Sequence, residues 1–448
     1  MIAAPTRRRT GRGQSVGARD REFRVVGYVS SAFGLGIAAA NTVRILQSAG
    51  LPVSVVDVDP GGGRQGRDAT FLALERELPA RGAVNVLHLN PPQILEFQAQ
   101  WVDAISLRGG VNVCVPFWEL PHLPESWVPV LNGMDAVLAP TRFIAETCER
   151  SLTRPVVHYP QAVSVPGDVV ADRARWGIDP GATAYLIAYD AESDTARKNP
   201  LAALSAFEQA FADADDVLLL VKLNQSELSQ TQRDEVDTLR NRLAGLSNVR
   251  FIEGNLPYRD VLSLYASCDV LVSLHRAEGL GLHLMEAMAL GRVVVATGWS
   301  GNMDFMTAEN SCPVPYQLVP VVSTNAAYAP EADRAEQLWA EADTTEAARV
   351  LRLTYEQPEL RERIGKQAAT DMAERCVSVA RAEQLREMAA WPRARCASDR
   401  ERAALRDLLE AARRSQPDAP GALAYRWARA KRRAVLELRA RGLYPDKG

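Results

Sequence analysis

Short apolar runs alternate with helical stretches along most of the chain, and this alternation starts twice. The first series begins with a strand expected at residues 23–30 and ends with a helix at 142–150. The second begins with a strand at 184–189 and includes further strands at 270–274 and 293–296. Strands separated by helices of this length favour a parallel sheet covered by helices on both faces. The sequence therefore predicts an α/β chain with two doubly wound halves.

The expected domain boundaries follow from where these series begin and end and from where the charge changes. Residues 1–22 are basic and lack an apolar core segment, which predicts a disordered leader and not a signal peptide. Residues 23–168 and 169–390 form the two expected domains. Residues 392–448 carry 15 Lys and Arg against 7 Asp and Glu and show no strand pattern. A helical, basic C-terminal extension is therefore predicted over residues 391–448.

The stretch 269–305 carries the most chemical information in the chain. Its pattern predicts a strand, a glycine-bearing loop, a short helix and a second strand. Glu278 stands in the loop, and Glu286 lies about two turns further on in the helix. Backbone N–H groups at a helix N-terminus bind phosphate well, and a carboxylate nearby can accept both hydroxyls of a ribose. The segment therefore indicates a nucleotide site.

This pattern resembles the E-x7-E motif of retaining glycosyltransferases of the GT-B fold, family 4. The positions that match include Gly279, Gly281, Glu286, Ala287 and Gly291, followed by Val-Val-Ala-Thr. The resemblance covers roughly residues 23–388 and is strongest in the second half. It implies an α/β GT-B enzyme, in which two Rossmann-like domains face a cleft and a helical extension follows. It also implies a hexosyltransferase that uses a nucleotide sugar and needs neither a metal nor another cofactor.

The same resemblance implies roles for particular residues. Arg197 and Lys198 open a helix, where two cations oppose the helix dipole, and the family places a lysine there against the donor diphosphate. Many members have Gly-Arg after the preceding strand, where this chain has Tyr189-Asp190. The expected catalytic residues are Glu278, Lys198 and Arg197. The expected donor-binding residues are Glu286, Gly279, Leu280, Gly281, Leu282, Asn255, Leu256, Gly34 and Gly36.

Four residues of the first half are expected on the acceptor side. Asn90 replaces a histidine that related enzymes place near the transferred sugar, and its amide can bond a sugar hydroxyl. His88 is interpreted either as part of this site or as a packed strand-end residue. Trp118 and Glu119 belong to a Trp-Glu-Leu segment similar to one in a bacterial subset of the family. The tryptophan either stacks on a sugar or belongs to the core.

Two other enzyme classes remain as alternatives. Gly34-Leu35-Gly36, followed by Ala39 and Asp57, imitates the fingerprint of a nicotinamide-dependent oxidoreductase, although three residues separate it from the preceding strand. A GT-B sugar-nucleotide epimerase is the second alternative. Asp57-Val58-Asp59 also imitates a metal motif, but its place before Pro60 favours an ordinary turn. No metal site is predicted.

Composition narrows the expected partners and location. The formal net charge of −3 argues against nucleic acid as a partner. Six scattered cysteines without a C-x-x-C pair and the lack of an 18-residue apolar run predict a cytoplasmic protein. A basic amphipathic helix around 427–438 would suit the inner face of a membrane. The expected substrates are a GDP- or UDP-linked sugar, with mannose favoured by the resemblance, and a glycan or lipid-linked acceptor.

Overall fold

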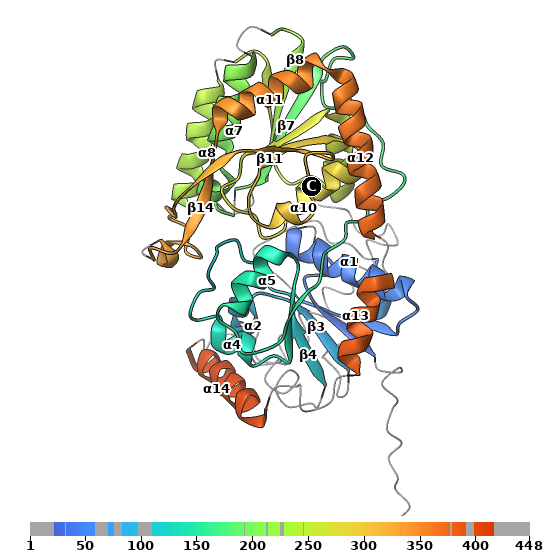
Figure 1. The fold of residues 1–448 in the computed structure, drawn as a ribbon, viewed down its shortest axis with the longest axis vertical. Coiled ribbons are helices and arrows are strands. Elements are labelled where there is room, and N and C mark those ends of the chain that lie inside the picture. Colours follow the sequence, from blue (N-terminus) through green and yellow to red (C-terminus); the bar gives the residue numbers. More distant parts are fainter. Residues whose placement is uncertain are drawn as a thin grey trace, which may run out of the picture.

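The protein is described by a computed structural model, shown in Figure 1. The described residues are 22–31, 33–58, 70–75, 83–96, 110–191, 193–211, 214–224, 228–244, 246–332, 334–376, 379–390 and 398–415. The leader expected at 1–22, except for its last residue, and the tail helix expected at 427–438 lie outside this part of the chain.

The first half forms a six-stranded sheet in the order β2-β1-β3-β4-β5-β6, and all of its strand pairs are parallel. Its strands are β1 (Phe23–Gly27), β2 (Val53–Asp57), β3 (Val84–His88), β4 (Val111–Cys114), β5 (Ala136–Ala139) and β6 (Val156–His158). Its helices include α1 (Gly34–Ser48), α2 (Pro91–Glu96), α4 (Val128–Asn132) and α5 (Arg142–Glu149). Valines and leucines fill both faces of these strands, which is why the sheet needs helices on either side.

The second half repeats this architecture with the order β12-β11-β10-β7-β8-β9, again with parallel pairing throughout. Its strands are β7 (Thr183–Asp190), β8 (Val217–Asn224), β9 (Val249–Glu253), β10 (Val270–Ser273), β11 (Val293–Thr297) and β12 (Cys312–Val314). Its helices are α6 (Thr195–Lys198), α7 (Pro200–Phe211), α8 (Gln230–Leu243), α9 (Tyr258–Ser267) and α10 (Leu282–Ala289). The predicted fold class of two doubly wound α/β halves is confirmed.

Among the described residues, four helices follow the second sheet, and the last two of them return to the first half. The four are α11 (Thr344–Glu356), α12 (Pro358–Cys376), α13 (Val379–Ala389) and α14 (Asp399–Ser415). Leu385 and Met388 of α13 join the core of the first sheet. Leu405 of α14 covers Gly133, where a Cβ atom would lie 2.7 Å from the leucine Cβ. Figure 1 shows α13 and α14 beside the first sheet, although α11 and α12 lie on the second.

Three local features differ from the sequence-based expectation. Arg197 and Lys198 do not open a helix but end the short helix α6, because Asn199 caps it with a φ of 49° before α7 begins at Pro200. Gly34-Leu35-Gly36, which imitates a nicotinamide-binding fingerprint, does not form a loop but the first turn of α1, which begins at Gly34. An antiparallel hairpin of β13 (Tyr316–Pro320) and β14 (Leu338–Ala342) was not expected. β13 is mostly exposed and ends on a proline, so it lacks the apolar pattern that marks the buried strands. No helix among the described residues is long and apolar enough to cross a membrane.

At Gly36, α1 packs closely against the backbone that follows β1. A Cβ atom there would lie 2.1 Å from the carbonyl oxygen of Ser31 and 2.5 Å from that of Tyr28. Gly36→Ala should therefore cost roughly 1–3 kcal/mol of stability, as overpacking does. Gly34→Ala is the matched control, because a Cβ at Gly34 meets nothing within 4 Å. Thermal melting of both variants checks this, and equal melting temperatures would contradict it.

Candidate active site

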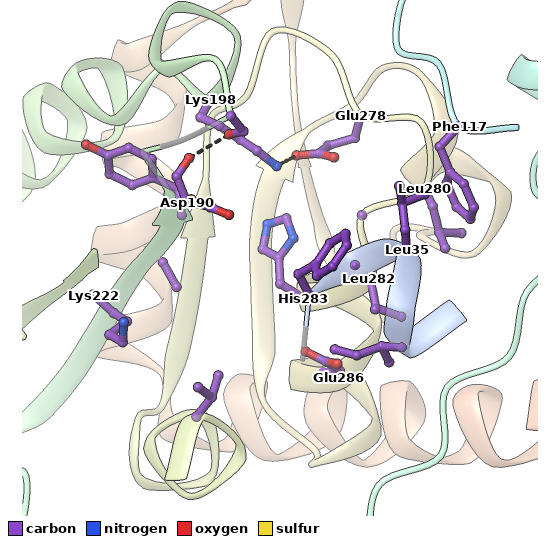
Figure 2. A pocket seen from close by; sticks show the side chains of 18 of the residues that line it. Leu35, Phe117, Asp190, Lys198, Lys222, Glu278, Leu280, Leu282, His283 and Glu286 are labelled. Atoms are coloured by element: carbon purple, nitrogen blue, oxygen red, sulfur yellow. Dashed lines mark hydrogen bonds and ion pairs between the residues drawn. The ribbon is translucent and has the colours of Figure 1, made fainter. Parts of the chain in front are cut away.

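A cavity of about 420 Å³ lies between the two halves, and Figure 2 shows it from close by. The first half contributes the start of α1 and the loops after β3 and β4. The second half contributes the ends of β7 and β8, α6, the turn after β9 and the start of α10. The predicted site residues that line the cavity are Gly34, Asn90, Glu119, Arg197, Lys198, Asn255, Leu256, Glu278, Leu280, Gly281, Leu282 and Glu286.

Glu278 is the centre of a buried group of charges. The Lys198 ammonium donates to Glu278 Oε1, and Arg197 Nη1 lies 3.5 Å from Oε2. The Arg197 guanidinium also donates to the Ala277 carbonyl oxygen at 2.8 Å. Asp194 caps α6 by accepting from the Arg197 N–H, so this four-residue helix is held in position from its first turn. Both cations expected at the site therefore meet the expected carboxylate.

The charge state of Glu278 follows from these neighbours. Burial alone raises the pKa of a carboxyl group, but the nearby cations Lys198 and Arg197 outweigh it and hold the pKa of Glu278 well below its ordinary value. The carboxylate is thus ionised at neutral pH. Removing one cation would leave a buried charge without its partner, which is the costly case for an ion pair.

The loop that carries Glu278 depends on close backbone approach. Gly281 has a φ of 84° and stands as the N-cap of α10, a conformation that favours glycine. Gly279 lies against the first half: its carbonyl oxygen accepts from Thr141 Oγ1 at 2.9 Å, and a Cβ there would lie 2.9 Å from the Trp118 carbonyl oxygen. Gly279 is therefore outside the cavity lining, but it joins the loop to the opposite half.

Glu286 is bound by a tyrosine that the sequence analysis did not identify. Tyr258, in the first turn of α9, donates its hydroxyl to Glu286 Oε1 at 2.7 Å, and both side chains line the cavity. Burial raises the pKa of Glu286 to about 7, although the hydrogen bond from Tyr258 opposes this rise. The carboxyl group thus sits in the cavity with one hydroxyl already bound, as it would bind a hydroxyl of a ligand.

A chain of hydrogen bonds fixes which ring nitrogen carries the proton in the buried His275 and the half-buried His283. The amide of Asn302 donates to the Thr297 carbonyl oxygen at 2.9 Å, so its oxygen accepts from His275 Nε2 at 3.0 Å. Burial lowers the pKa of His275 to about 4 and that of His283 to about 3, so both rings are neutral. His275 Nδ1 then accepts from the Ser273 hydroxyl at 3.0 Å.

The Ser273 oxygen is left to accept from His283 Nε2, which lies 3.4 Å away. His283 therefore carries its proton on Nε2 and keeps the lone pair of Nδ1. Figure 2 shows the His283 side chain between the Lys198–Glu278 pair and Glu286. The chain could not be predicted from spacing, because its members come from β10, α10 and the turn after β11.

The turn after β9 is held by a lysine of β8. Lys222 Nζ donates to the Gly254 carbonyl oxygen at 2.7 Å, next to the predicted pair Asn255 and Leu256. Gly254 has a φ of 89°, which favours glycine in this turn. Burial lowers the pKa of Lys222 to about 8, with Asp190 opposing the shift. Lys222 and Asp190 both line the cavity, so this end of the site carries charge of both signs.

The acceptor-side predictions separate into two groups. Asn90 lines the cavity, but its amide brackets Phe117: its nitrogen donates to the Phe117 carbonyl oxygen at 3.0 Å and its oxygen accepts from the Phe117 N–H at 2.8 Å. Glu119 also lines the cavity and accepts from the hydroxyl of Tyr328 at 2.7 Å. These two residues are where a ligand could reach them.

The other two acceptor-side residues are packed away from the cavity. His88 has no exposed surface, and burial lowers its pKa to about 3, which corresponds to the packed strand-end interpretation. Trp118 is buried against Trp127 and Tyr328, with ring centroids 4.9 and 5.4 Å away, and its indole donates to the His122 carbonyl oxygen. The core interpretation of this tryptophan therefore corresponds to the structure.

The described residues that imitate a nicotinamide fingerprint and a metal motif contact the protein's own backbone. Gly36 does not line the cavity: a Cβ atom added there would point at the backbone of Tyr28 and Ser31. Asp57 is buried and accepts from the Ser30 N–H at 3.1 Å. Asp59 lies outside the described residues. Within the described ranges, no group of three or more His, Cys, Asp or Glu side chains could hold a metal ion.

Comparisons with known proteins agree with this architecture. Residues 195–317 match the family model of glycosyl transferases group 1. Sucrose-phosphate synthase from Thermosynechococcus elongatus has a TM-score of 0.58 at 14% identity, over 82% of this chain and 97% of that one. Anabaena HepE, solved with UDP and glucose, has a TM-score of 0.55 at 14% identity, over 84% of this chain and 100% of that one.

A third match shares less of its length. The pneumococcal O-GlcNAc transferase GtfA, solved with UDP and GlcNAc, has a TM-score of 0.46 at 13% identity, over 70% of this chain. The chain spans 57% of the length of GtfA. A comparison with curated protein sequences gives no match.

The raised pKa of Glu286 predicts a pH-dependent stability. The folded protein holds a proton between about pH 4.5 and 7 that the unfolded chain has released, so this residue's contribution to the free energy of unfolding is lost as pH rises through that window. The loss should reach the order of 3 kcal/mol. Because the lowered pKa values of His88, His275 and His283 act in the opposite direction, the prediction concerns differences between curves. The free energy of unfolding of wild type should fall relative to that of Glu286→Gln as pH rises, whereas wild type and the exposed control Glu362→Gln should differ by a constant amount. Urea unfolding from pH 5 to 8 measures the difference; parallel curves for wild type and Glu286→Gln would contradict it.

Proposed function

We propose that this chain, a retaining group 1 glycosyltransferase of the GT-B fold, transfers a hexose from a nucleoside diphosphate sugar to a glycan or glycolipid. The observation that carries the proposal is the single cavity edge that joins Lys198, Glu278, the N-terminus of α10 and Glu286. These groups offer, in order, a cation, a carboxylate, backbone N–H donors and a second carboxylate. That series suits a diphosphate between a sugar and a ribose.

The donor would lie across the second half with its ribose at Glu286. Both ribose hydroxyls are donors, and they would take over the oxygen that Tyr258 now binds at 2.7 Å. The base would lie at the turn of Asn255 and Leu256, which Lys222 braces. Backbone donors at the start of α10 and the Lys198 ammonium would meet the diphosphate. Glu278 would accept from hydroxyls of the transferred sugar.

Transfer then requires stabilising the charge that develops on the departing diphosphate. Buried Arg197 and half-buried Lys198 lie beside the buried Glu278, where water screens their charge less than at the surface. The acceptor hydroxyl would approach from the face that the diphosphate leaves, and its proton would pass to a phosphate oxygen. The new bond would therefore form on the same face as the broken one. Asn90 and Glu119 line the cavity from the first half, and we propose that the acceptor enters on their side.

The alternative of a nicotinamide enzyme receives no support from the cavity. Its fingerprint would use the Asp57 carboxylate for a ribose, but that carboxylate already accepts from the Ser30 N–H. Its second glycine, Gly36, faces the protein's own backbone.

The finer features of the substrates are part of the same proposal. Mannose from GDP-mannose is the donor favoured by the sequence resemblance, whereas the solved complex of HepE contains UDP and glucose. We place the enzyme in the cytoplasm, where nucleotide sugars are made. A basic C-terminal extension would bring it to the inner face of a membrane that carries a lipid-linked acceptor.

A nucleotide-sugar panel tests the proposed function. Thermal shift is measured with UDP-glucose, UDP-N-acetylglucosamine, GDP-mannose and NADH, and the products are analysed by mass spectrometry with and without EDTA. One nucleotide sugar should raise the melting temperature by mass action, and its turnover should survive EDTA. Glu286→Ala should weaken donor binding by about 1.5–3 kcal/mol and so reduce the rise in melting temperature. Stabilisation by NADH alone, or release of an epimerised sugar, would select an alternative instead.

Lys198 should affect both stability and rate, and the two effects can be separated. Lys198→Ala leaves the buried Glu278 carboxylate without its nearest cation, at a cost of about 3–5 kcal/mol. Adding Glu278→Gln should recover most of the stability but none of the rate, which should stay roughly a hundredfold or more below wild type. The exposed Lys366→Ala is the control. A double variant that regains normal turnover would remove both residues from the proposed mechanism.

A further inference from the structure

The loop between β13 and β14 crosses from the second half to the first. On its own half, Ser323 Oγ donates to Asp194 Oδ2 at 2.6 Å and Asn325 Nδ2 donates to the Ser193 carbonyl oxygen at 3.1 Å. Asp194 is the residue that caps α6, the helix of Arg197 and Lys198. The first part of the loop is therefore tied to the segment that carries the two cations.

The end of the same loop is tied to the segment 118–123 of the opposite half. Gln337 pairs with the backbone of His122, donating at 2.9 Å and accepting at 3.2 Å. Arg334 Nη1 donates to the Leu123 carbonyl oxygen at 3.2 Å. Glu331 binds both side chains, at 2.6 Å from Gln337 Nε2 and 3.0 Å from Arg334 Nη1. The loop thus spans the two halves with well-formed polar contacts at each end.

Tyr328 stands between these two anchors. Its ring stacks on Trp118, with centroids 5.4 Å apart and planes at 23°. Its hydroxyl donates to Glu119 Oε2 at 2.7 Å, and the Arg197 guanidinium carbon lies 5.7 Å from the ring centroid. Burial raises the pKa of Tyr328 well above its ordinary value, so it remains a hydroxyl donor. One buried side chain therefore contacts a residue on each wall of the cavity.

We infer that Tyr328 is a positioning residue of the active site, which orients the Glu119 carboxylate and supports Arg197 from behind. Tyr328 itself does not line the cavity, whereas Glu119 and Arg197 do, so it acts through them. Its hydroxyl occupies one oxygen of Glu119, which fixes how that carboxylate is presented on the acceptor side. Its ring gives the Arg197 guanidinium, which also contacts Glu278, a cation–π neighbour. The predicted effect of Tyr328 on the rate rests on the proposed function. Its predicted effect on the two segments that it joins, 118–123 and 194–199, does not.

The kinetic test uses whichever of UDP-glucose, UDP-N-acetylglucosamine and GDP-mannose the wild-type protein hydrolyses fastest, with water as acceptor. Tyr328→Phe keeps the ring and loses only the hydrogen bond to a charged group, so kcat should fall about tenfold. KM for the donor should stay within about twofold, because the donor lies on the second half. The control Tyr316→Phe alters an exposed tyrosine of the same hairpin and should change neither value.

A double-variant cycle separates positioning from general support of the fold. If Tyr328 acts through Glu119, then Tyr328→Phe should cause no further loss of kcat when Glu119→Gln is already present. Losses that multiply, a normal kcat in Tyr328→Phe, or equal changes in kcat and KM with a lowered melting temperature would each overturn the inference.

Hydrogen exchange gives a readout that does not depend on any substrate. In Tyr328→Ala, amide hydrogens of residues 118–123 and 194–199 should exchange at least about tenfold faster than in Tyr316→Ala, because both segments lose the side chain that joins them. Equal exchange in the two variants would overturn the inference. A wild-type protein that hydrolyses none of the three donors would instead overturn the proposed function, and the exchange result would still decide the role of Tyr328.

Discussion

The site is organised around one buried carboxylate. Glu278 comes from the loop before α10, while its two cations, Arg197 and Lys198, come from a four-residue helix about 80 positions earlier. A charge buried here is tolerable only with partners in contact, so the loop and α6 must be placed together. The same loop then sets where α10 begins, and with it the backbone donors and Glu286.

The position of that loop depends in turn on the parallel sheet. The loop follows β10, a central strand of the second sheet, and the strands beside it deliver α6 and the turn after β11 to the same edge. Ligands of open α/β sheets bind at this carboxyl edge of the strands. Gly301 allows the turn after β11 to come close, since a Cβ there would lie 2.1 Å from the Gly279 carbonyl oxygen. The sheet therefore provides the frame, and close backbone contacts complete it.

The two halves meet through more than the walls of the cavity. The Thr141 hydroxyl donates to Gly279, and His158 lies 2.7 Å from Asp304 across the boundary. On the other side, the hairpin loop binds residues of the segment 118–123. Because α13 and α14 also return to the first half (Figure 1), the chain crosses the boundary repeatedly. The relative placement of Glu119 and Glu278 thus depends on contacts that several separate segments of the chain make across the boundary.

The sequence by itself determined the α/β architecture and the part of the site that the second half contributes. Buried parallel strands are continuous apolar runs, and the E-x7-E segment contains strand, loop and helix in one local stretch, so both can be predicted without long-range information. Only the tertiary structure decided which of the remaining candidates face the cavity. His88, Trp118 and Gly36 have the residue types of a site, but packing turns them toward the protein interior. Tyr258, His283 and Tyr328 carry no local signal, because their roles arise from partners between 10 and 209 positions away in the chain.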